Sequence, residues 1–285
     1  MGGKEQSCKS EPVRSTIDGT VAVHQKETMT PDPLLSFRLD ERVAVVTGAS
    51  SGLGARFSRV LTAAGARVVL VARRGDRLAE LERELPGAIA IEADVAAADT
   101  AERVVGTALE RFGRVDVLVN NAGIQNAIPA LDASIDDFRQ ILEVNLVGAF
   151  ALAQHAARSM IDSERGGSIV NVSSILGLVG VGQLPNAAYI ASKSGLVGLT
   201  RELAAQWARR GVRVNSLAPG WFETEMTVDS MFGDERAHHW IKSRTPMGRG
   251  GAAHELDGAL LFLSSDASSF VTGVTLPVDG GWTAV

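Results

Sequence analysis

A tyrosine and a lysine lie four positions apart in this chain, Tyr189 and Lys193. On a helix, residues at this spacing share one face, so the two side chains can act together. A free tyrosine has a pKa of about 10, too high for efficient proton transfer near neutrality, but a nearby ammonium favours the phenolate. The pair could therefore perform general acid–base chemistry, with Tyr189 transferring the proton and Lys193 lowering its pKa. Tyr189 is the only tyrosine in the sequence.

A glycine-rich stretch at residues 47–54 precedes the pair and reads Thr-Gly-Ala-Ser-Ser-Gly-Leu-Gly. Glycines allow a tight turn and a close approach of the backbone to a pyrophosphate, and a helix that begins there offers free N–H groups. The same turn could join a strand to a helix without any ligand. Its position after the first of several alternating apolar runs favours a dinucleotide loop, with Gly48, Gly52 and Gly54 as its glycines.

The elements that would position these residues follow from the apolar pattern. Seven short apolar, β-branched runs predict strands buried on both faces: residues 42–47, 67–71, 88–91, 115–119, 168–172, 212–216 and 274–278. Helical periodicity lies between them, over residues 55–64, 77–85, 100–112, 135–160, 189–210 and 254–263. This alternation predicts right-handed crossovers and a parallel sheet. The predicted fold is α/β, a single doubly wound Rossmann-type domain with a seven-stranded parallel sheet flanked by helices.

Composition and charge narrow the function classes. The chain has 285 residues and a formal net charge of -5 without a long basic run, so we expect no nucleic-acid partner. No apolar stretch is long enough for a membrane-spanning helix, so we expect no membrane partner. Cys8 is the only cysteine, which excludes an internal disulfide and a cysteine-based metal site. We expect no metal and a cytoplasmic location.

Three segments of the chain differ in character. Residues 1–37 mix charges of both signs and are predicted to be a disordered tail. Residues 38–285 are predicted to form the folded domain. Within it, residues 221–245 form a long connection with apolar side chains, among them Trp221 and Trp240. Such a connection can be a lid over a substrate, and packed core or a subunit contact explains it equally well.

These motifs resemble those of the short-chain dehydrogenase/reductase family, including its 3-oxoacyl-[acyl-carrier-protein] reductases and gluconate 5-dehydrogenase-like members. The resemblance rests on the glycine loop, on Asn-Asn-Ala-Gly at residues 120–123 and on the Tyr189–Lys193 pair, and it runs from about Leu39 to the C-terminus. It implies an NAD(P)-dependent oxidoreductase acting on CH–OH donors, which transfers a hydride between the cofactor and a ketone or secondary alcohol, with a carbonyl reductase as the main interpretation. Enoyl reductases of related fold use a wider tyrosine–lysine spacing.

The resemblance implies four catalytic residues. Tyr189 would be the general acid in reduction and the general base in oxidation, and Lys193 would bind the ribose and tune Tyr189. Ser174, which follows the strand at 168–172, would hold the substrate oxygen and stabilise developing negative charge. Asn145 would bend a helix and hold a water next to the lysine, and asparagine is indeed a poor residue for a helix interior. The interval from Ser174 to Tyr189 is two residues longer than is usual in acyl-carrier-protein ketoreductases.

The end of the second predicted strand indicates which cofactor is used. Ala72 stands where NAD-preferring relatives carry an acid, and Arg73, with Arg74 beside it, suits a 2′-phosphate. We therefore expect NADP(H), with NAD(H) as the alternative. By resemblance, the cofactor contacts would come from Gly48, Ser50, Ser51, Gly52, Leu53, Gly54, Arg73, Arg74, Asp94, Val95, Asn121, Ala122, Gly123, Tyr189, Lys193, Pro219, Gly220, Phe222 and Thr224.

Two other functions remain open. The same residues could oxidise a sugar, polyol or steroid alcohol with NAD. A non-catalytic dinucleotide-sensing regulator would bind the cofactor without turnover, but such proteins typically lose the tyrosine or the lysine. The substrate is expected to be a small carbonyl or alcohol, selected by Gln125, residues 177–188 and the connection at 221–245. The resemblance also implies a homo-oligomer, namely a tetramer.

Overall fold

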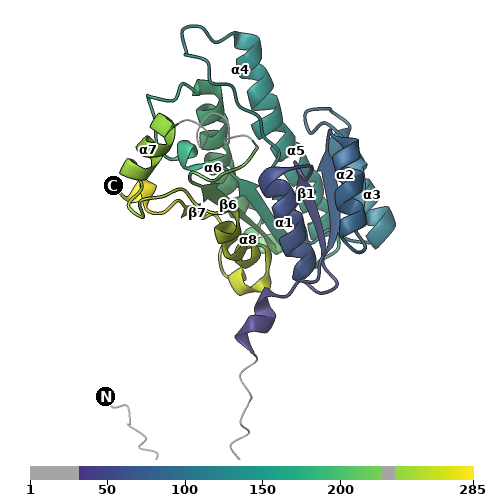
Figure 1. The fold of residues 1–285 in the computed structure, drawn as a ribbon. Helices are drawn as coiled ribbons and strands as arrows, with labels where there is room; N and C mark the ends of the chain where they lie inside the picture. Colours follow the sequence, from purple (N-terminus) through teal and green to yellow (C-terminus); the bar gives the residue numbers. More distant parts are fainter. Residues whose placement is uncertain (1–31, 226–234) are drawn as a thin grey trace, which may run out of the picture. The chain divides into compact units, whose positions relative to one another are not determined.

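The computed structural model describes residues 32–225 and 235–285, which are built around a seven-stranded parallel sheet (Figure 1). The strand order is β3-β2-β1-β4-β5-β6-β7, and all neighbours pair in parallel. The strands are β1 Val43–Thr47, β2 Arg67–Ala72, β3 Ile89–Glu92, β4 Val117–Asn120, β5 Gly167–Val172, β6 Val212–Pro219 and β7 Thr275–Val278. The predicted doubly wound Rossmann-type fold is confirmed, and each predicted apolar run overlaps one strand.

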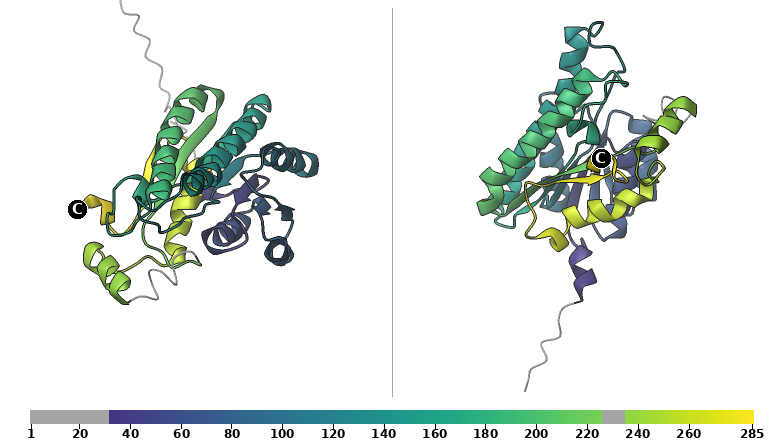
Figure 2. Two further views of the ribbon diagram at one scale, coloured as in Figure 1. Left: turned by 90° about the horizontal axis from the view of Figure 1, so that it is seen from above. Right: turned by 90° about the vertical axis from the view of Figure 1, so that its left-hand side faces the viewer.

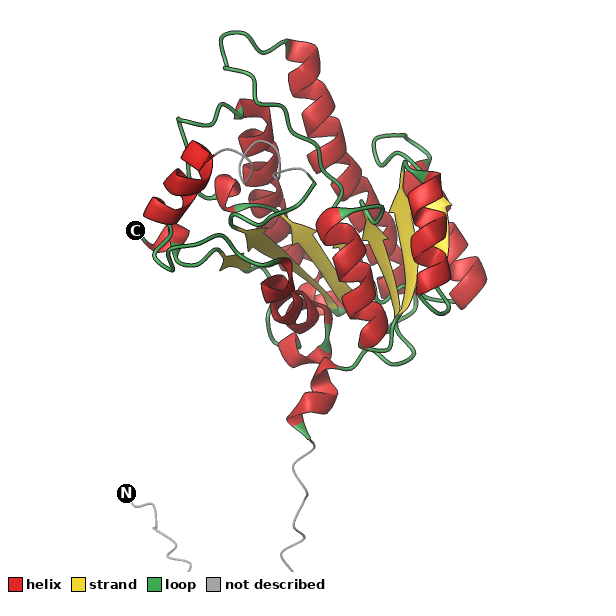
Figure 3. Cartoon of the chain, in the orientation of Figure 1, coloured by secondary structure: helices red, strands yellow, loops and turns green. Residues whose placement is uncertain are grey.

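Helices cover both faces of the sheet, which is buried between them (Figures 2 and 3). One apolar core joins the sheet to α1 Gly52–Ala63, α2 Gly75–Glu84 and α8 Asp257–Ser264. A second core on the other face joins it to α3 Thr100–Phe112, α5 Gly148–Asp162 and α6 Ala187–Trp207. Two further helices are α4 Ile135–Leu142 and α7 Glu235–Arg244. Within the described residues, no helix is both long and apolar enough to cross a membrane.

The strand order reverses at β1, whose neighbours are β2 on one side and β4 on the other. Crossovers that leave such a pair turn to opposite faces of the sheet, so a crevice forms beyond the carboxyl ends of the strands. All five residues of β1 are buried, which explains its continuous run of apolar, mostly β-branched side chains. The fold therefore directs the loops after the strands toward one common site.

The predicted helix over residues 135–160 is divided by a π-helical segment, Glu143–Val147, which lies between α4 and α5. Asn145 is fully buried within this segment. Single π turns inside helices add one residue to the turn and are frequent at functional sites. The uniform helical pattern of the sequence does not reveal this interruption, although Asn145 was identified as an unusual residue there.

The predicted tail and the predicted lid both differ in part from expectation, and parts of both lie outside the described residues. Pro33–Phe37 form a 3-10 helix, so the predicted disordered tail is wrong for these five residues. The Asp32 side chain accepts a hydrogen bond from the Leu34 N–H and starts this turn. The rest of the predicted tail, residues 1–31, lies outside the described residues, as do residues 226–234 of the predicted lid. The described remainder of that connection contains α7, which the sequence pattern did not predict.

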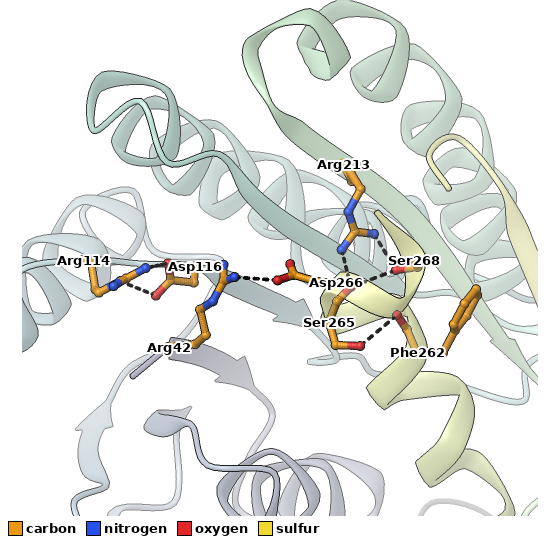
Figure 4. A network of polar contacts seen from close by, with 8 residues as sticks. All are labelled: Arg42, Arg114, Asp116, Arg213, Phe262, Ser265, Asp266 and Ser268. Carbon is orange, nitrogen blue, oxygen red and sulfur yellow. Dashed lines mark hydrogen bonds and ion pairs between the residues drawn. The ribbon is translucent and has the colours of Figure 1, made fainter. Parts of the chain in front are cut away.

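A buried carboxylate links the start of β1 to the start of β4, at the amino-terminal ends of the strands (Figure 4). Asp116 is 2% exposed and accepts the N–H of Val43, at 2.8 Å, and two hydrogen bonds from Arg114, at 2.5 and 2.7 Å. The same figure shows Arg42 bound to Asp266, at 2.9 Å. Buried charges are tolerated when they are paired and hydrogen-bonded in this way. These contacts therefore stabilise the amino-terminal ends of the strands, which lie opposite to the crevice.

We expect Asp116→Ala to lower the free energy of unfolding by about 3 kcal/mol, because it leaves the Val43 N–H and the Arg114 guanidinium without their acceptor. Urea denaturation of wild type and variant measures this. The control is Asp136→Ala, since Asp136 is 92% exposed and pairs with the exposed Arg139. The control should change stability by less than about 0.5 kcal/mol. An equal loss of unfolding free energy in both variants would show that the Asp116 contacts contribute no more to stability than an exposed ion pair.

Candidate active site

A cavity of about 400 Å³ opens at the carboxyl ends of strands β1 to β6. Two of the residues predicted for the site, Gly54 and Asn145, do not line it. The predicted residues that line it are Gly48, Ser50, Ser51, Gly52, Leu53, Arg73, Arg74, Asp94, Val95, Asn121, Ala122, Gly123, Ser174, Tyr189, Lys193, Pro219, Gly220, Phe222 and Thr224. Residues from six separate loops thus meet in one cavity.

The glycine loop leaves the start of α1 open toward the cavity. Gly48 and Gly52 have left-handed backbone angles, with φ of 67° and 52°, which side chains other than glycine rarely adopt. Ser51 precedes α1 without capping it through its side chain, and the first turn of α1 carries no acid. Helix N–H groups and the positive end of the helix dipole are therefore available to an anion. Gly54 has no room for a Cβ against the Gly48 carbonyl, so its role is in packing.

Tyr189 and Lys193 meet Ser174 at the end of β5. The Lys193 ammonium is buried and its Nζ donates a hydrogen bond to the carbonyl of Val172, at 2.8 Å. The same Nζ lies 5.5 Å from the centroid of the Tyr189 ring. Ser174 forms a side-chain hydrogen bond with Tyr189 and also accepts the N–H of Leu176, at 3.1 Å. The predicted catalytic tyrosine, lysine and serine are therefore neighbours.

The pKa of Tyr189 differs from the sequence-based expectation. Burial raises the pKa of this phenol above its usual value, and the hydrogen bond with Ser174 opposes the rise only in part. Burial also lowers the pKa of Lys193 to about 8. The expected lowering of the Tyr189 pKa is wrong for the chain by itself, because loss of water around a phenolate outweighs the favourable contacts.

Asn145 supports the site from behind rather than facing the cavity. Its Oδ1 accepts the Ile124 N–H at 2.8 Å, and its Nδ2 donates to the Ile124 carbonyl at 2.9 Å and to Ser192 Oγ at 3.0 Å. Ser192 Oγ in turn donates to the Tyr189 carbonyl at 2.7 Å. One amide thus connects the loop after β4 to the turn of α6 that carries Tyr189.

The two asparagines after β4 have different surroundings. Asn120 is buried and donates to the Ala149 carbonyl and to Asn171 Oδ1, at 3.0 Å each. Asn121 lines the cavity, and its Nδ2 donates to the Thr47 carbonyl at 2.9 Å. Both side chains thus satisfy polar groups of neighbouring segments. Asn121 also fixes the backbone that leads to Gly123 at the cavity wall.

The two arginines after β2 are not equivalent. The Arg73 side chain is 62% exposed, and its Nη1 lies 4.0 Å from Asp94 Oδ2. Arg74 donates to the hydroxyls of Ser50, at 3.1 Å, and Ser51. It also pairs with Glu225 Oε2, at 3.2 Å. Both guanidinium groups reach the cavity, but Arg74 is already held by the chain.

Three tryptophans form a cluster beside the catalytic helix. Trp221, Trp240 and Trp282 contact one another edge to face, with ring centroids 5.0 to 5.7 Å apart. They share one apolar cluster with Leu176, near the end of β5, and with Tyr189. The described part of the connection at 221–245 is thus packed core around the site. Whether the connection also acts as a lid stays a prediction.

The loop before Tyr189 is attached to the loop after β4. Asn186, the residue before α6, donates through Nδ2 to Gln125 Oε1 at 3.0 Å. The Asn186 Oδ1 is buried and has no hydrogen-bond partner among the residues that the structure describes. An unpaired buried acceptor is unusual in a folded protein and requires an explanation. It lies in the segment expected to select the substrate.

The structure adds three groups that sequence reasoning did not identify: Ser192, the Val172 carbonyl and Glu225. Ser192 lies within the Tyr189–Lys193 motif, so its position next to Lys193 was the available signal. A backbone carbonyl has no side-chain signal in the sequence. Glu225 and Arg74 are 151 positions apart in the sequence, so only the fold reveals their contact.

We expect Ser192→Ala to lower the free energy of unfolding by about 1–2 kcal/mol, because it removes a buried hydroxyl that both accepts and donates. It should also lower turnover by loosening Asn145 from the turn of Tyr189. Thermal or urea unfolding and steady-state kinetics measure the two effects. Ser194→Ala is the matched control, since Ser194 is exposed on the same helix. If both variants behave like wild type, Ser192 does not hold the site.

Comparisons with known proteins agree with this geometry. The family model described as Enoyl-(Acyl carrier protein) reductase matches residues 48–283. Galactitol 2-dehydrogenase (L-tagatose-forming) of Cereibacter sphaeroides is 42% identical over 87% of this chain and 97% of its own length. A 3-oxoacyl-[acyl-carrier-protein] reductase of Thermotoga maritima is 39% identical over 86% of this chain and 98% of its own.

A solved structure gives the same result. The crystal structure of a gluconate 5-dehydrogenase from Burkholderia cenocepacia J2315, in complex with NADP and tartrate, superposes with a TM-score of 0.85. It is 39% identical and covers 89% of this chain and 100% of its own. With this coverage and identity, and with an oxidoreductase site in the expected cleft, the chain belongs to the short-chain dehydrogenase/reductase family.

Proposed function

We propose that the chain is an NADP(H)-preferring oxidoreductase that interconverts a hydroxyl-rich secondary alcohol, such as a polyol or sugar acid, and its ketone. The observation that carries the proposal is the meeting of Tyr189, Lys193 and Ser174 at a cavity whose opposite end is formed by the glycine loop. We expect a dinucleotide to bind along this cavity, because the open start of α1 can bind a pyrophosphate. A sensor without turnover would not need the proton-transfer residues at the other end.

The residues of the chain would divide the chemistry as follows. A bound nicotinamide supplies or accepts the hydride. In reduction, Tyr189 donates a proton from Oη to the substrate oxygen, while the Ser174 hydroxyl orients that oxygen and stabilises its developing charge. Lys193 uses one of its three N–H donors on the Val172 carbonyl, which leaves two for the ribose and for the region of Tyr189. Oxidation runs through the same groups in reverse.

The preference for NADP(H) is supported by the end of β2. Ala72 lines the cavity and offers no acceptor for a ribose hydroxyl, whereas Arg73 offers an exposed guanidinium. Guanidinium groups bind phosphate through paired hydrogen bonds. NADP is also the ligand named for the gluconate 5-dehydrogenase structure.

A hydroxyl-rich substrate is supported mainly by the relatives. The Asn186–Gln125 contact lies in the segments expected to select the substrate, although neither residue lines the cavity. The names of two relatives, galactitol 2-dehydrogenase and gluconate 5-dehydrogenase, belong to enzymes for such compounds. A simple carbonyl reductase is the second candidate, supported by the acyl-carrier-protein ketoreductase relative.

A homotetramer and a cytoplasmic location are further proposals. Val147 and Phe150 are 46% and 39% exposed on one side of the π segment and α5, which is a large apolar exposure for that face. A second copy of this chain is the occupant that the family resemblance implies. The molar mass in solution, compared between wild type and Phe150→Glu, tests this; a wild-type monomer would contradict it.

Tyr189→Phe tests the central role. We expect turnover to fall by at least ~10²-fold, because the variant keeps the ring but cannot transfer a proton. Binding of NADPH, followed by its fluorescence, should stay within about twofold of wild type. A panel of polyols, sugar acids and ketones is used for the activity assay. Survival of most activity would contradict the mechanism.

Arg73→Ala tests the cofactor preference. We expect the affinity for NADP⁺ to fall by about tenfold and the affinity for NAD⁺ to stay the same, because only the former carries the 2′-phosphate. Arg83→Ala, which removes an exposed arginine of α2 outside the cavity, is the control. Tighter binding of NAD⁺ than NADP⁺ by wild type would overturn the preference.

A further inference from the structure

One carboxylate at the mouth of the cavity has three hydrogen-bond donors of the chain around it. Glu225 accepts from Arg77 through Oε1 and from Arg74 through Oε2, the latter at 3.2 Å. It also forms a side-chain hydrogen bond with Ser51 of the glycine loop. Two guanidinium groups and a hydroxyl therefore converge on a single anion.

Two of these donors line the cavity, whereas Arg77 lies just outside its lining. Ser51, Arg74 and Glu225 all line it, and Arg74 also donates to Ser50. Arg77 lies in the first turn of α2, which begins directly after Arg74. Glu225 comes from a different region, the segment after β6 that contains Thr224. A side chain of this segment thus reaches the loops after β1 and β2.

The donor set has the chemistry of a phosphate site. Paired guanidinium donors and serine hydroxyls are the groups that bind phosphate monoesters in proteins. A carboxylate satisfies the same donors with one negative charge and two oxygens. A phosphate monoester offers up to two negative charges and three oxygens. The favourable contacts with Arg77 and Arg74 lower the pKa of the Glu225 carboxyl, so it is an anion near neutrality.

The contacts are weak enough to be exchanged. The side chains of Arg74, Arg77 and Glu225 are 42%, 43% and 52% exposed. Ion pairs at such exposure contribute little to stability because water and salt screen them. A ligand with a higher charge in the same place can therefore replace the carboxylate.

We propose that Glu225 is an internal competitor for the 2′-phosphate of the cofactor, occupying the Arg74, Arg77 and Ser51 donors until NADP(H) displaces it. The inference rests on the proposed NADP(H) preference. Displacement frees the segment around Thr224 from the adenosine side, whereas NAD(H), which lacks the 2′-phosphate, leaves Glu225 in place. Glu225 is thus a specificity-determining residue that moderates the advantage of NADP(H) over NAD(H).

Calorimetric titration with adenosine 2′,5′-bisphosphate and with 5′-AMP tests this on the full chain, because the two probes differ only in the 2′-phosphate. Glu225→Gln should bind the bisphosphate about three- to tenfold more tightly than wild type and bind 5′-AMP equally well. Glu223→Gln is the matched control. Glu223 is exposed and lies two residues before Glu225, so the substitution removes the same charge nearby. It should leave the affinities for both probes unchanged.

The outcomes separate the inference from the function on which it rests. Wild type that binds both probes equally would overturn the NADP(H) preference, and the competitor role with it. Wild type that prefers the bisphosphate, combined with an unchanged or lower affinity in Glu225→Gln, would overturn the competitor role alone. An equal gain for both probes, or the same gain in Glu223→Gln, would mean a general charge effect and would also overturn it.

Discussion

The hydrogen bond from Lys193 to the Val172 carbonyl fixes the geometry on which the site depends. A buried ammonium needs an acceptor, and the last residue of β5 provides one at 2.8 Å. This contact sets the rotation and height of α6 against the sheet. Tyr189, one turn earlier on α6, is thereby placed beside Ser174, which follows β5. The alignment of proton donor and substrate oxygen is thus a consequence of how one helix meets one strand.

The π-helical segment provides the second support for this arrangement. A regular helix would place residue 145 differently against the loop after β4, whereas here the Asn145 amide binds both backbone groups of Ile124 and Ser192. The Ser192 hydroxyl in turn donates a hydrogen bond to the Tyr189 carbonyl. Hydrogen bonds therefore join the loop after β4, the π segment and the turn of α6 that carries Tyr189. Such a buried network favours one arrangement because each unpaired member would be costly.

Much of this fold could be predicted because its signals are local. Apolar runs mark strands that are buried on both faces, and the glycine loop marks the turn after β1, so the residues of the cavity were identified from motifs. The family resemblance implies a bend at Asn145, but the π segment could not be predicted from the apolar pattern, since a single added residue does not disturb the period of residues 135–160. Nor could the pKa of Tyr189, which is raised by burial that only the folded chain provides. The pairing of Arg74 with Glu225 is likewise a product of tertiary structure.

The central claim is that Tyr189 is a half-buried phenol whose pKa is raised by the loss of water around it, and the chain allows a direct measurement. Because Tyr189 is the only tyrosine, tyrosinate absorbance followed against pH reports on this one side chain. We expect the pKa in the protein alone to lie above the ordinary value of about 10. It should fall when NADP⁺ is bound, because the positive nicotinamide ring favours the phenolate. A pKa at or below the ordinary value in the protein alone, unchanged by NADP⁺, would contradict this account of the site.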